Sequence, residues 1–121
     1  EWVRKNCVVT KEAEEALQKL PGPFTVVLKL KKKNALAQNV TLGKETIGIR
    51  LPKHWFGKVV EKAGIPIITT SANKSGHKFM TSLPDLDHEV ERGVEFMIYE
   101  GPKEAHPSRI INVVEGTEKE R

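Results

Sequence analysis

Cysteine, aromatic residues and long apolar runs are scarce in this 121-residue chain, and each scarcity excludes a class of protein. Cys7 is the only cysteine, so no internal disulfide can form, which fits the reducing cytoplasm. No apolar run approaches the ~20 residues of a membrane-spanning helix, and no signal peptide is recognisable. Aromatic residues make up 6% of the chain, which leaves little material for a surface that stacks nucleic-acid bases.

The common motifs of catalytic and metal sites are also missing. The chain has no Gly-x-x-x-x-Gly-Lys-Ser/Thr phosphate loop, no Gly-x-Gly-x-x-Gly fingerprint and no Gly-x-Ser-x-Gly nucleophile elbow. Its histidines lack the spacing of zinc ligands: His54, His77, His88 and His106. We therefore expect no protein-bound metal and no covalent acyl-enzyme chemistry, and we assign no catalytic side chain.

The composition that remains is that of an ordinary soluble domain. Hydrophobic residues make up 38% and charged residues 30%, with a formal net charge of +4. This positive excess suits an anionic ligand such as a nucleotide but does not require one. The length predicts one domain over residues 1–121. Because the chain begins at Glu1 rather than Met, we expect that domain to be partial.

Predicted helices and strands alternate along the chain, which favours an α/β fold with a parallel or mixed sheet. Thr10 is a predicted N-cap, and apolar residues at helical spacing follow it until Pro21-Gly22-Pro23 ends the helix. Further helices are expected over 52–63, ended by Gly64, and over 83–92. Strands are expected over 24–30, 44–51, 65–70 (buried on both faces), 94–99 (half-buried) and 109–114.

Polar side chains gather at the ends of these predicted strands. Thr46 and Arg50 share one face of a strand, Ser71 and Asn73 follow the run 65–70, and Ser108 precedes the last strand. A guanidinium, hydroxyls and an amide at the ligand-binding edge of an α/β sheet could hold a carboxylate and phosphates. Each residue alone could equally cap a turn or form a surface ion pair. The residues by themselves therefore indicate an α/β domain with a candidate anion site.

Four segments, in order, resemble the sequence blocks of the YrdC/TsaC family. They are Pro-Gly-Pro-Phe-Thr-Val-Val-Leu at 21–28, Thr-Ile-Gly-Ile-Arg-Leu-Pro at 46–52, the run 66–76 containing Ser-Ala-Asn-Lys-Ser-Gly, and 101–113. The resemblance implies a YrdC-like twisted, mixed open sheet with flanking helices and a concave ligand cleft. It also implies truncation at the N-terminus, because the family's Lys-x-Arg-Pro segment is not in the chain. Arg109 and Asn112 stand where the family usually has threonine and aspartate.

The resemblance further implies a nucleotidyltransferase. The family makes L-threonylcarbamoyl-adenylate and pyrophosphate from ATP, L-threonine and bicarbonate, and Mg²⁺ would accompany the ATP. The product feeds a downstream threonylcarbamoyl-transferase complex that makes t6A beside the anticodon of tRNA. By the same resemblance, Arg50, Ser71 and Ser108 would bind threonine, and ATP would contact Thr46, Asn73, Thr81, Ser75 and Arg121.

Such chemistry needs positioning and charge stabilisation more than a side-chain nucleophile, which fits the absence of one. With the family's upstream lysine and arginine missing, we expect these residues alone to be inactive. Two other functions stay open. One is an RNA-binding module of YrdC type, whose affinity would fall steeply with salt. The other is a YrdC domain associated with a carbamoyltransferase.

Overall fold

The computed structural model describes residues 1–104 and 107–120 and divides the chain into two compact units. The first unit contains Glu1–Ile67 together with the C-terminal residues from Pro107, and the second contains the residues between them. The first unit carries the sheet and the core, and the second carries two short helical segments joined by loops.

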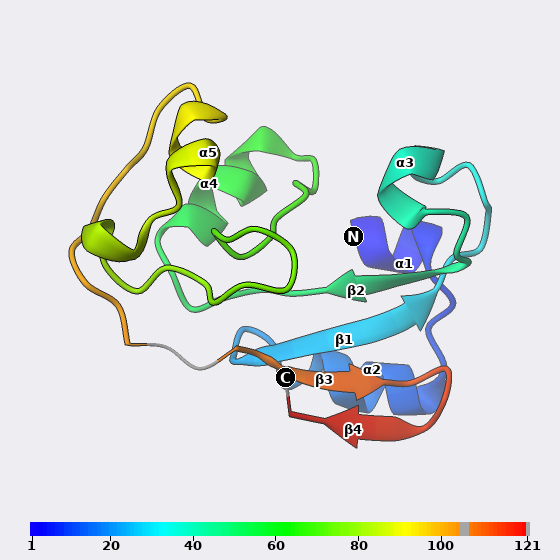
Figure 1. The fold of residues 1–121 in the computed structure, drawn as a ribbon. Helices are drawn as coiled ribbons and strands as arrows, with labels where there is room; N and C mark the ends of the chain where they lie inside the picture. Colours follow the sequence, from blue (N-terminus) through cyan, green and yellow to red (C-terminus); the bar gives the residue numbers. More distant parts are fainter. Residues whose placement is uncertain (105–106, 121) are drawn as a thin grey trace. The chain divides into compact units, whose positions relative to one another are not determined.

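The first unit contains a four-stranded mixed sheet with the strand order β2-β1-β3-β4 (Figure 1). The central strand β1 (Phe24–Lys29) pairs antiparallel with β2 (Thr46–Ile49) and parallel with β3 (Arg109–Asn112). Strand β4 (Thr117–Lys119) pairs antiparallel with β3. The open mixed α/β sheet and three of its strands are thus confirmed. Strand β4 escaped prediction because its three residues are polar and exposed, as suits a protected sheet edge.

Helix α2 (Lys11–Leu17) covers one side of this sheet. Thr10 caps it as predicted, since its hydroxyl accepts a hydrogen bond from the Ala13 N–H at 3.3 Å. Ala13 and Ala16 are buried, and they share a core cluster with residues of β1 and of the N-terminal segment. The members of this cluster are Cys7, Ala13, Ala16, Val26, Leu28 and Leu30.

Strand register divides the sheet into two faces, because residues opposite each other on paired strands point to the same side. Val26 lies opposite Ile49 on β2 and Ile111 on β3. The closed face consists of side chains that form or pack against the core: Val26, Leu28, Ile47, Ile49 and Ile111. The open face consists of the alternate residues, which are half-buried or exposed: Thr25, Val27, Thr46, Gly48, Ile110 and Asn112.

The remaining helices are short. Helices α1 (Trp2–Asn6) and α3 (Gln38–Thr41) were not predicted, and α4 (Phe56–Ala63) begins at Phe56 rather than at residue 52. Gly64 ends α4 with φ of 71°, as expected of a glycine C-cap. Within the described ranges, no helix combines the length and apolarity that crossing a membrane requires.

The helix predicted over 83–92 is instead two segments, the 3₁₀ turn Leu83–Asp85 and α5 (His88–Arg92). Asp87 explains the break, since its carboxylate accepts hydrogen bonds from Glu89 N–H at 2.8 Å and Val90 N–H at 3.3 Å. These bonds make Asp87 the N-cap of a new helix rather than an interior residue. They also lower the pKa of its carboxyl group, with the Glu89 N–H the largest cause.

Two predicted strands are wrong. Residues 65–70 and 94–99 form no strand, and their apolar side chains are exposed: Ile65 and Ile68 each to 65%, and Phe96 to 77%. A strand needs a neighbour to pair with, so the same apolar pattern adopts different structures in different surroundings. Neither run finds such a neighbour among the described residues, and Pro66 also lacks the N–H that a central strand would donate.

The core predicts where the first unit is sensitive to mutation. Leu28 is 1% exposed on the closed face, so Leu28→Ala should lower the free energy of unfolding by about 2–5 kcal/mol through lost burial and a cavity. Urea denaturation followed by circular dichroism measures this loss. Leu42→Ala is the matched control, because Leu42 is 79% exposed and its truncation should change stability by less than about 0.5 kcal/mol. Equal losses in the two variants would contradict the assigned core.

Candidate functional site

The Pro21-Gly22-Pro23 turn binds two chain segments at once. The Gly22 N–H donates to the Leu51 carbonyl at 3.0 Å, and the Arg109 N–H donates to the Pro23 carbonyl at 2.9 Å. Leu51 directly follows Arg50, and Arg109 directly follows Ser108. One turn therefore fixes the backbone next to two of the predicted threonine-binding residues.

Arg50 lies at the end of β2 with an exposed side chain. The β1–β2 register pairs Val26 with Ile49, and continuing it by one residue places Arg50 opposite Thr25, on the open face. Thr46 is half-buried on that same face. Arg50 forms no ion pair with any described residue, so its guanidinium is available to a ligand carboxylate.

Ser108 lies directly before β3, and its side chain is 1% exposed. Its Oγ lies 2.5 Å from Oγ1 of Thr25, a hydrogen bond in which either hydroxyl can be the donor. Thr25 itself is only half-buried. The sequence did not single out Thr25, although it is the threonine of the Pro-Gly-Pro-Phe-Thr block on which the family resemblance rests.

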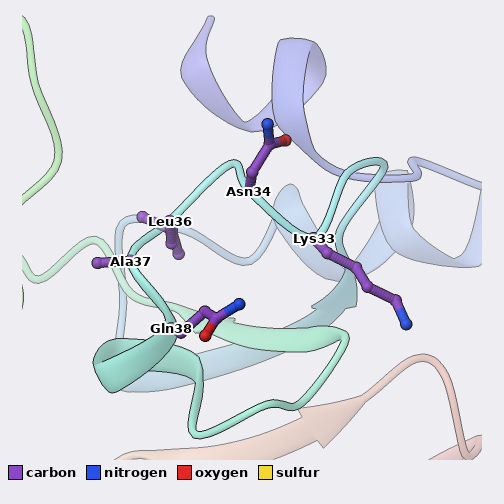
Figure 2. Close-up of a pocket in the computed structure, with 5 residues that line it drawn as sticks. All are labelled: Lys33, Asn34, Leu36, Ala37 and Gln38. Carbon is purple, nitrogen blue, oxygen red and sulfur yellow. The ribbon is translucent and has the colours of Figure 1, made fainter.

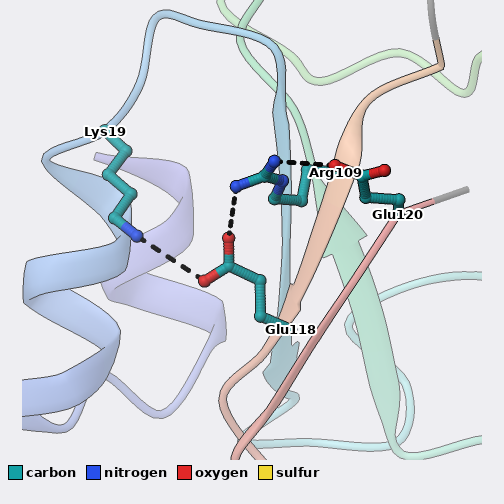
Figure 3. A network of polar contacts seen from close by, with 4 residues as sticks. All are labelled: Lys19, Arg109, Glu118 and Glu120. Carbon is teal, nitrogen blue, oxygen red and sulfur yellow. Dashed lines mark hydrogen bonds and ion pairs between the residues drawn. The ribbon is translucent and has the colours of Figure 1, made fainter.

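Arg109 belongs to a different environment from Arg50. Opposite Phe24 in the register, it points to the closed side of the sheet, where it contacts Glu118 at 3.3 Å and Glu120 at 2.8 Å. Figure 3 shows this network, in which Lys19 also contacts Glu118 at 3.9 Å. The hydrogen bond to Glu120 is the largest cause of a raised Arg109 pKa, so this side chain stays charged.

Asn112 also has a structural role. Its Oδ1 accepts hydrogen bonds from the Val114 N–H at 3.1 Å and the Glu115 N–H at 3.2 Å, in the turn between β3 and β4. An aspartate, the residue usual in the family at this position, could accept the same two bonds. The exchange of aspartate for asparagine therefore preserves the turn.

The second unit holds the predicted nucleotide contacts Asn73, Ser75 and Thr81, together with Ser71. Asn73 organises its loop, since its Nδ2 donates to the Lys74 carbonyl at 2.8 Å and to the His77 carbonyl at 3.1 Å. Its Oδ1 is enclosed and has no hydrogen-bond partner. Ser71 and Ser75 are exposed, so their hydroxyls are accessible.

Thr81 is half-buried and already has a partner. Its hydroxyl donates to Oδ2 of Asp85 at 2.7 Å, and Ser82 donates to the same oxygen at 3.0 Å. These hydrogen bonds, that of Thr81 being the largest cause, lower the pKa of the Asp85 carboxyl. A nucleotide contact by Thr81 would therefore use its remaining acceptor capacity or replace Asp85. Arg121, the last predicted contact, lies outside the described residues.

A hollow on the surface lies away from these residues. A pocket lined by Lys33, Asn34, Leu36, Ala37 and Gln38 follows β1 at its carboxyl end (Figure 2). The Pro21–Pro23 turn lies at the amino end of the same strand, and none of the predicted ligand residues lines the pocket. In the part of the chain that the structure describes, no group of three or more His, Cys, Asp or Glu side chains could hold a metal ion.

The ion pairs around Arg109 should contribute little to stability, because their partners are exposed. We expect Arg109→Gln to lower the free energy of unfolding by less than about 1 kcal/mol at low salt, and by less still in 1 M salt, where screening is strong. Denaturation curves at the two salt concentrations measure the difference. A loss that is larger, or independent of salt, would show that Arg109 stabilises the sheet by packing instead.

Comparison with known proteins identifies a matching family and related sequences. A model of the Sua5/YciO/YrdC family, described as telomere recombination, matches residues 1–120. A putative threonylcarbamoyl-AMP synthase of Methanocaldococcus jannaschii is 36% identical over 113 residues, which cover 92% of this chain and 52% of the relative. The threonylcarbamoyl-AMP synthase of Bacillus subtilis is 34% identical over 83 residues, covering 68% of this chain and 24% of the relative.

A solved structure is similar as well. The Sua5 protein of Pyrococcus abyssi, determined as a double variant, superposes with a TM-score of 0.73 at 30% identity over 87% of this chain and 32% of that chain. This likeness and the mixed sheet confirm the predicted YrdC-like open sheet with flanking helices, and the concave ligand cleft stays a prediction. The chain spans about half the length of the Methanocaldococcus relative and about a quarter of the Bacillus one.

Proposed function

Since this chain belongs to the Sua5/YciO/YrdC family, we propose that it forms part of an L-threonylcarbamoyladenylate synthase. The enzyme would convert ATP, L-threonine and bicarbonate into threonylcarbamoyl-AMP and pyrophosphate, for transfer to tRNA as t6A. Support comes from relatives that are named threonylcarbamoyl-AMP synthases and match 68–92% of the chain. The chain covers only 24–52% of their length, so the reaction is proposed for the full-length protein.

The observation that carries this proposal is the contrast between Arg50 and Arg109. Both are exposed arginines at strand ends of one sheet, but Glu118 and Glu120 neutralise Arg109 whereas Arg50 has no acidic partner among the described residues. An uncompensated guanidinium favours a planar carboxylate, which it binds through two parallel hydrogen bonds. We assign the carboxylate of L-threonine to Arg50.

The nucleotide side is assigned to Asn73, with Ser75, Thr81 and Thr46 as further contacts, and Ser71 is assigned to threonine. The Oδ1 of Asn73 has no hydrogen-bond partner but is enclosed, so the exocyclic amine of adenine or a ribose hydroxyl would donate to it only once the loop opens around it. Mg²⁺ would arrive with the phosphates of ATP as part of the substrate.

In the proposed reaction the threonine amine attacks the carbon of bicarbonate, and water leaves as the carbamate forms. A carbamate oxygen then attacks the α-phosphorus, and the bond to the leaving pyrophosphate breaks. This chain would contribute orientation: Arg50 fixes the carboxylate and thereby the direction of the amine, and the loop around Asn73 holds the nucleotide. Holding the reactants in a reactive arrangement can by itself lower the activation free energy by several kcal/mol.

Arg50→Ala in the full-length natural protein tests the assignment. Pyrophosphate release from ATP and bicarbonate should depend on L-threonine, and the variant should lower kcat/KM for threonine by about 100-fold or more, as expected when a charge-assisted contact of about 3 kcal/mol is lost. Arg109→Ala is the matched control and should leave the rate unchanged, because Arg109 points to the closed side and contacts glutamates.

Pyrophosphate release that does not depend on L-threonine would refute the synthase proposal. RNA affinity that falls steeply with salt would then favour the RNA-binding module, and carbamoyl transfer without threonine would favour a carbamoyltransferase-associated domain. An assay of the 121 residues alone tests the separate prediction that they are inactive. The cytoplasmic location stays a prediction.

Asn73→Asp tests the nucleotide side. The change replaces the Nδ2 donor with an oxygen, so the bonds to the Lys74 and His77 carbonyls are lost and a negative charge enters the loop assigned to the nucleotide. We expect the KM for ATP to rise about tenfold or more, with a smaller effect on the KM for threonine. His77→Ala is the control, since His77 takes part through its backbone carbonyl. Equal effects on both substrates would count against the assignment.

A further inference from the structure

Thr25 lies on the open face near the amino end of β1, and the sequence did not single it out. We propose that Thr25 is a ligand-contacting residue that donates a hydrogen bond to the amino-acid carboxylate held by Arg50, and that Ser108 is a positioning residue acting through Thr25. The inference rests on the proposed function for the identity of the amino acid. It reverses the roles that the family resemblance implied, in which Ser108 itself touches threonine.

Burial is the first reason for this reversal. Ser108 is 1% exposed, so its hydroxyl is enclosed by protein atoms. Thr25 is half-buried on the open face, so it is the member of the pair that a ligand can reach. A buried hydroxyl must have a hydrogen-bond partner to avoid a large desolvation cost, and Thr25 Oγ1 at 2.5 Å is that partner.

The hydrogen-bonding capacity of the two hydroxyls is the second reason. Each hydroxyl has one proton to donate and two lone pairs to accept. If Ser108 donates to Thr25, the proton of Thr25 stays free for a ligand oxygen, and that oxygen is a carboxylate oxygen if it lies beside Arg50. The continued β1–β2 register places Arg50 directly opposite Thr25, so one carboxylate can bind both side chains.

Gly48 is the third reason, because it limits where Thr25 can point. A Cβ added at Gly48 would lie 3.0 Å from Cγ2 of Thr25, so the methyl group of Thr25 fills the space that a side chain on β2 would take. With its methyl group against Gly48 and its hydroxyl against Ser108, Thr25 is held on both sides. Such a fixed hydroxyl is pre-organised for binding and loses little rotamer entropy when the ligand arrives.

Substitutions at Thr25 in the full-length natural protein test the proposal, with steady-state KM for L-threonine and for ATP as the two readouts. Thr25→Val keeps the shape and removes the hydroxyl, and it should raise the threonine KM about tenfold with the ATP KM unchanged. Thr25→Ser restores the hydroxyl and should stay within about twofold of the natural protein. Ser108→Ala should raise the threonine KM less than Thr25→Val, and the double variant should match Thr25→Val alone.

Gly48→Ala provides an independent test that leaves every hydroxyl in place. Its new methyl group should displace Thr25 and raise the threonine KM, whether or not Thr25→Val folds. An unchanged threonine KM in Thr25→Val or in Gly48→Ala would overturn the inference, as would an equal rise in both KM values or an additive effect of Ser108→Ala. If Arg50→Ala abolishes threonine dependence while Thr25→Val does not alter it, the proposed function survives and this inference fails. If the natural protein shows no threonine dependence, both fail.

Discussion

Two backbone hydrogen bonds at the Pro21–Pro23 turn hold together the part of the molecule on which the candidate site depends. Gly22 donates to Leu51 and Pro23 accepts from Arg109, so the end of β2 and the start of β3 are tied to the same three residues. A Cβ at Gly22 would lie 2.7 Å from the Lys19 carbonyl oxygen, a distance that backbone atoms cannot accommodate. The turn therefore requires glycine at this position for lack of space, and its proline neighbours limit the conformations open to it.

Because successive residues of a strand point to opposite faces, the residues that form the core alternate with the residues that are open to a ligand. Alternate residues of β1, β2 and β3 face the core, where Val26 and Leu28 are buried with the alanines of α2. The residues between them face outward and include Thr25, Thr46 and Asn112. Arg50 and Arg109 show the result, since one step of this alternation decides whether an arginine is available to a ligand or engaged with Glu118 and Glu120.

Local signals in the sequence were sufficient for elements that are completed by nearby residues. Thr10 caps α2 with its own hydroxyl, Gly64 ends α4, and the β-branched run of β1 lies at the centre of a sheet that buries it. Runs 65–70 and 94–99 show the same apolar character but no strand, because pairing depends on distant residues that a local pattern does not specify.

The candidate site shows the same division. The resemblance of short blocks identified Arg50 and Asn73 as candidates. The structure shows Arg50 exposed, and it shows Asn73 with an enclosed Oδ1 that has no hydrogen-bond partner. The burial of Ser108 and its bond to Thr25 join residues 83 positions apart, so no window of sequence could reveal them. The ion pairs of Arg109 likewise depend on β4, a strand too short and too polar to be recognised beforehand.

The contact between Gly48 and Thr25 has an evolutionary consequence. The γ-methyl of Thr25 occupies the space beside Gly48, so the residue accepted at either position depends on the residue at the other. Serine, which lacks that methyl group, would release the constraint and permit alanine on β2 without displacing the hydroxyl. In related sequences, substitutions at these two positions should therefore occur in a fixed order. Serine should replace threonine at position 25 before alanine replaces glycine at position 48. Such a dependence would indicate that the residues at positions 25 and 48 are constrained by where the hydroxyl must lie, and not by the stability of the sheet.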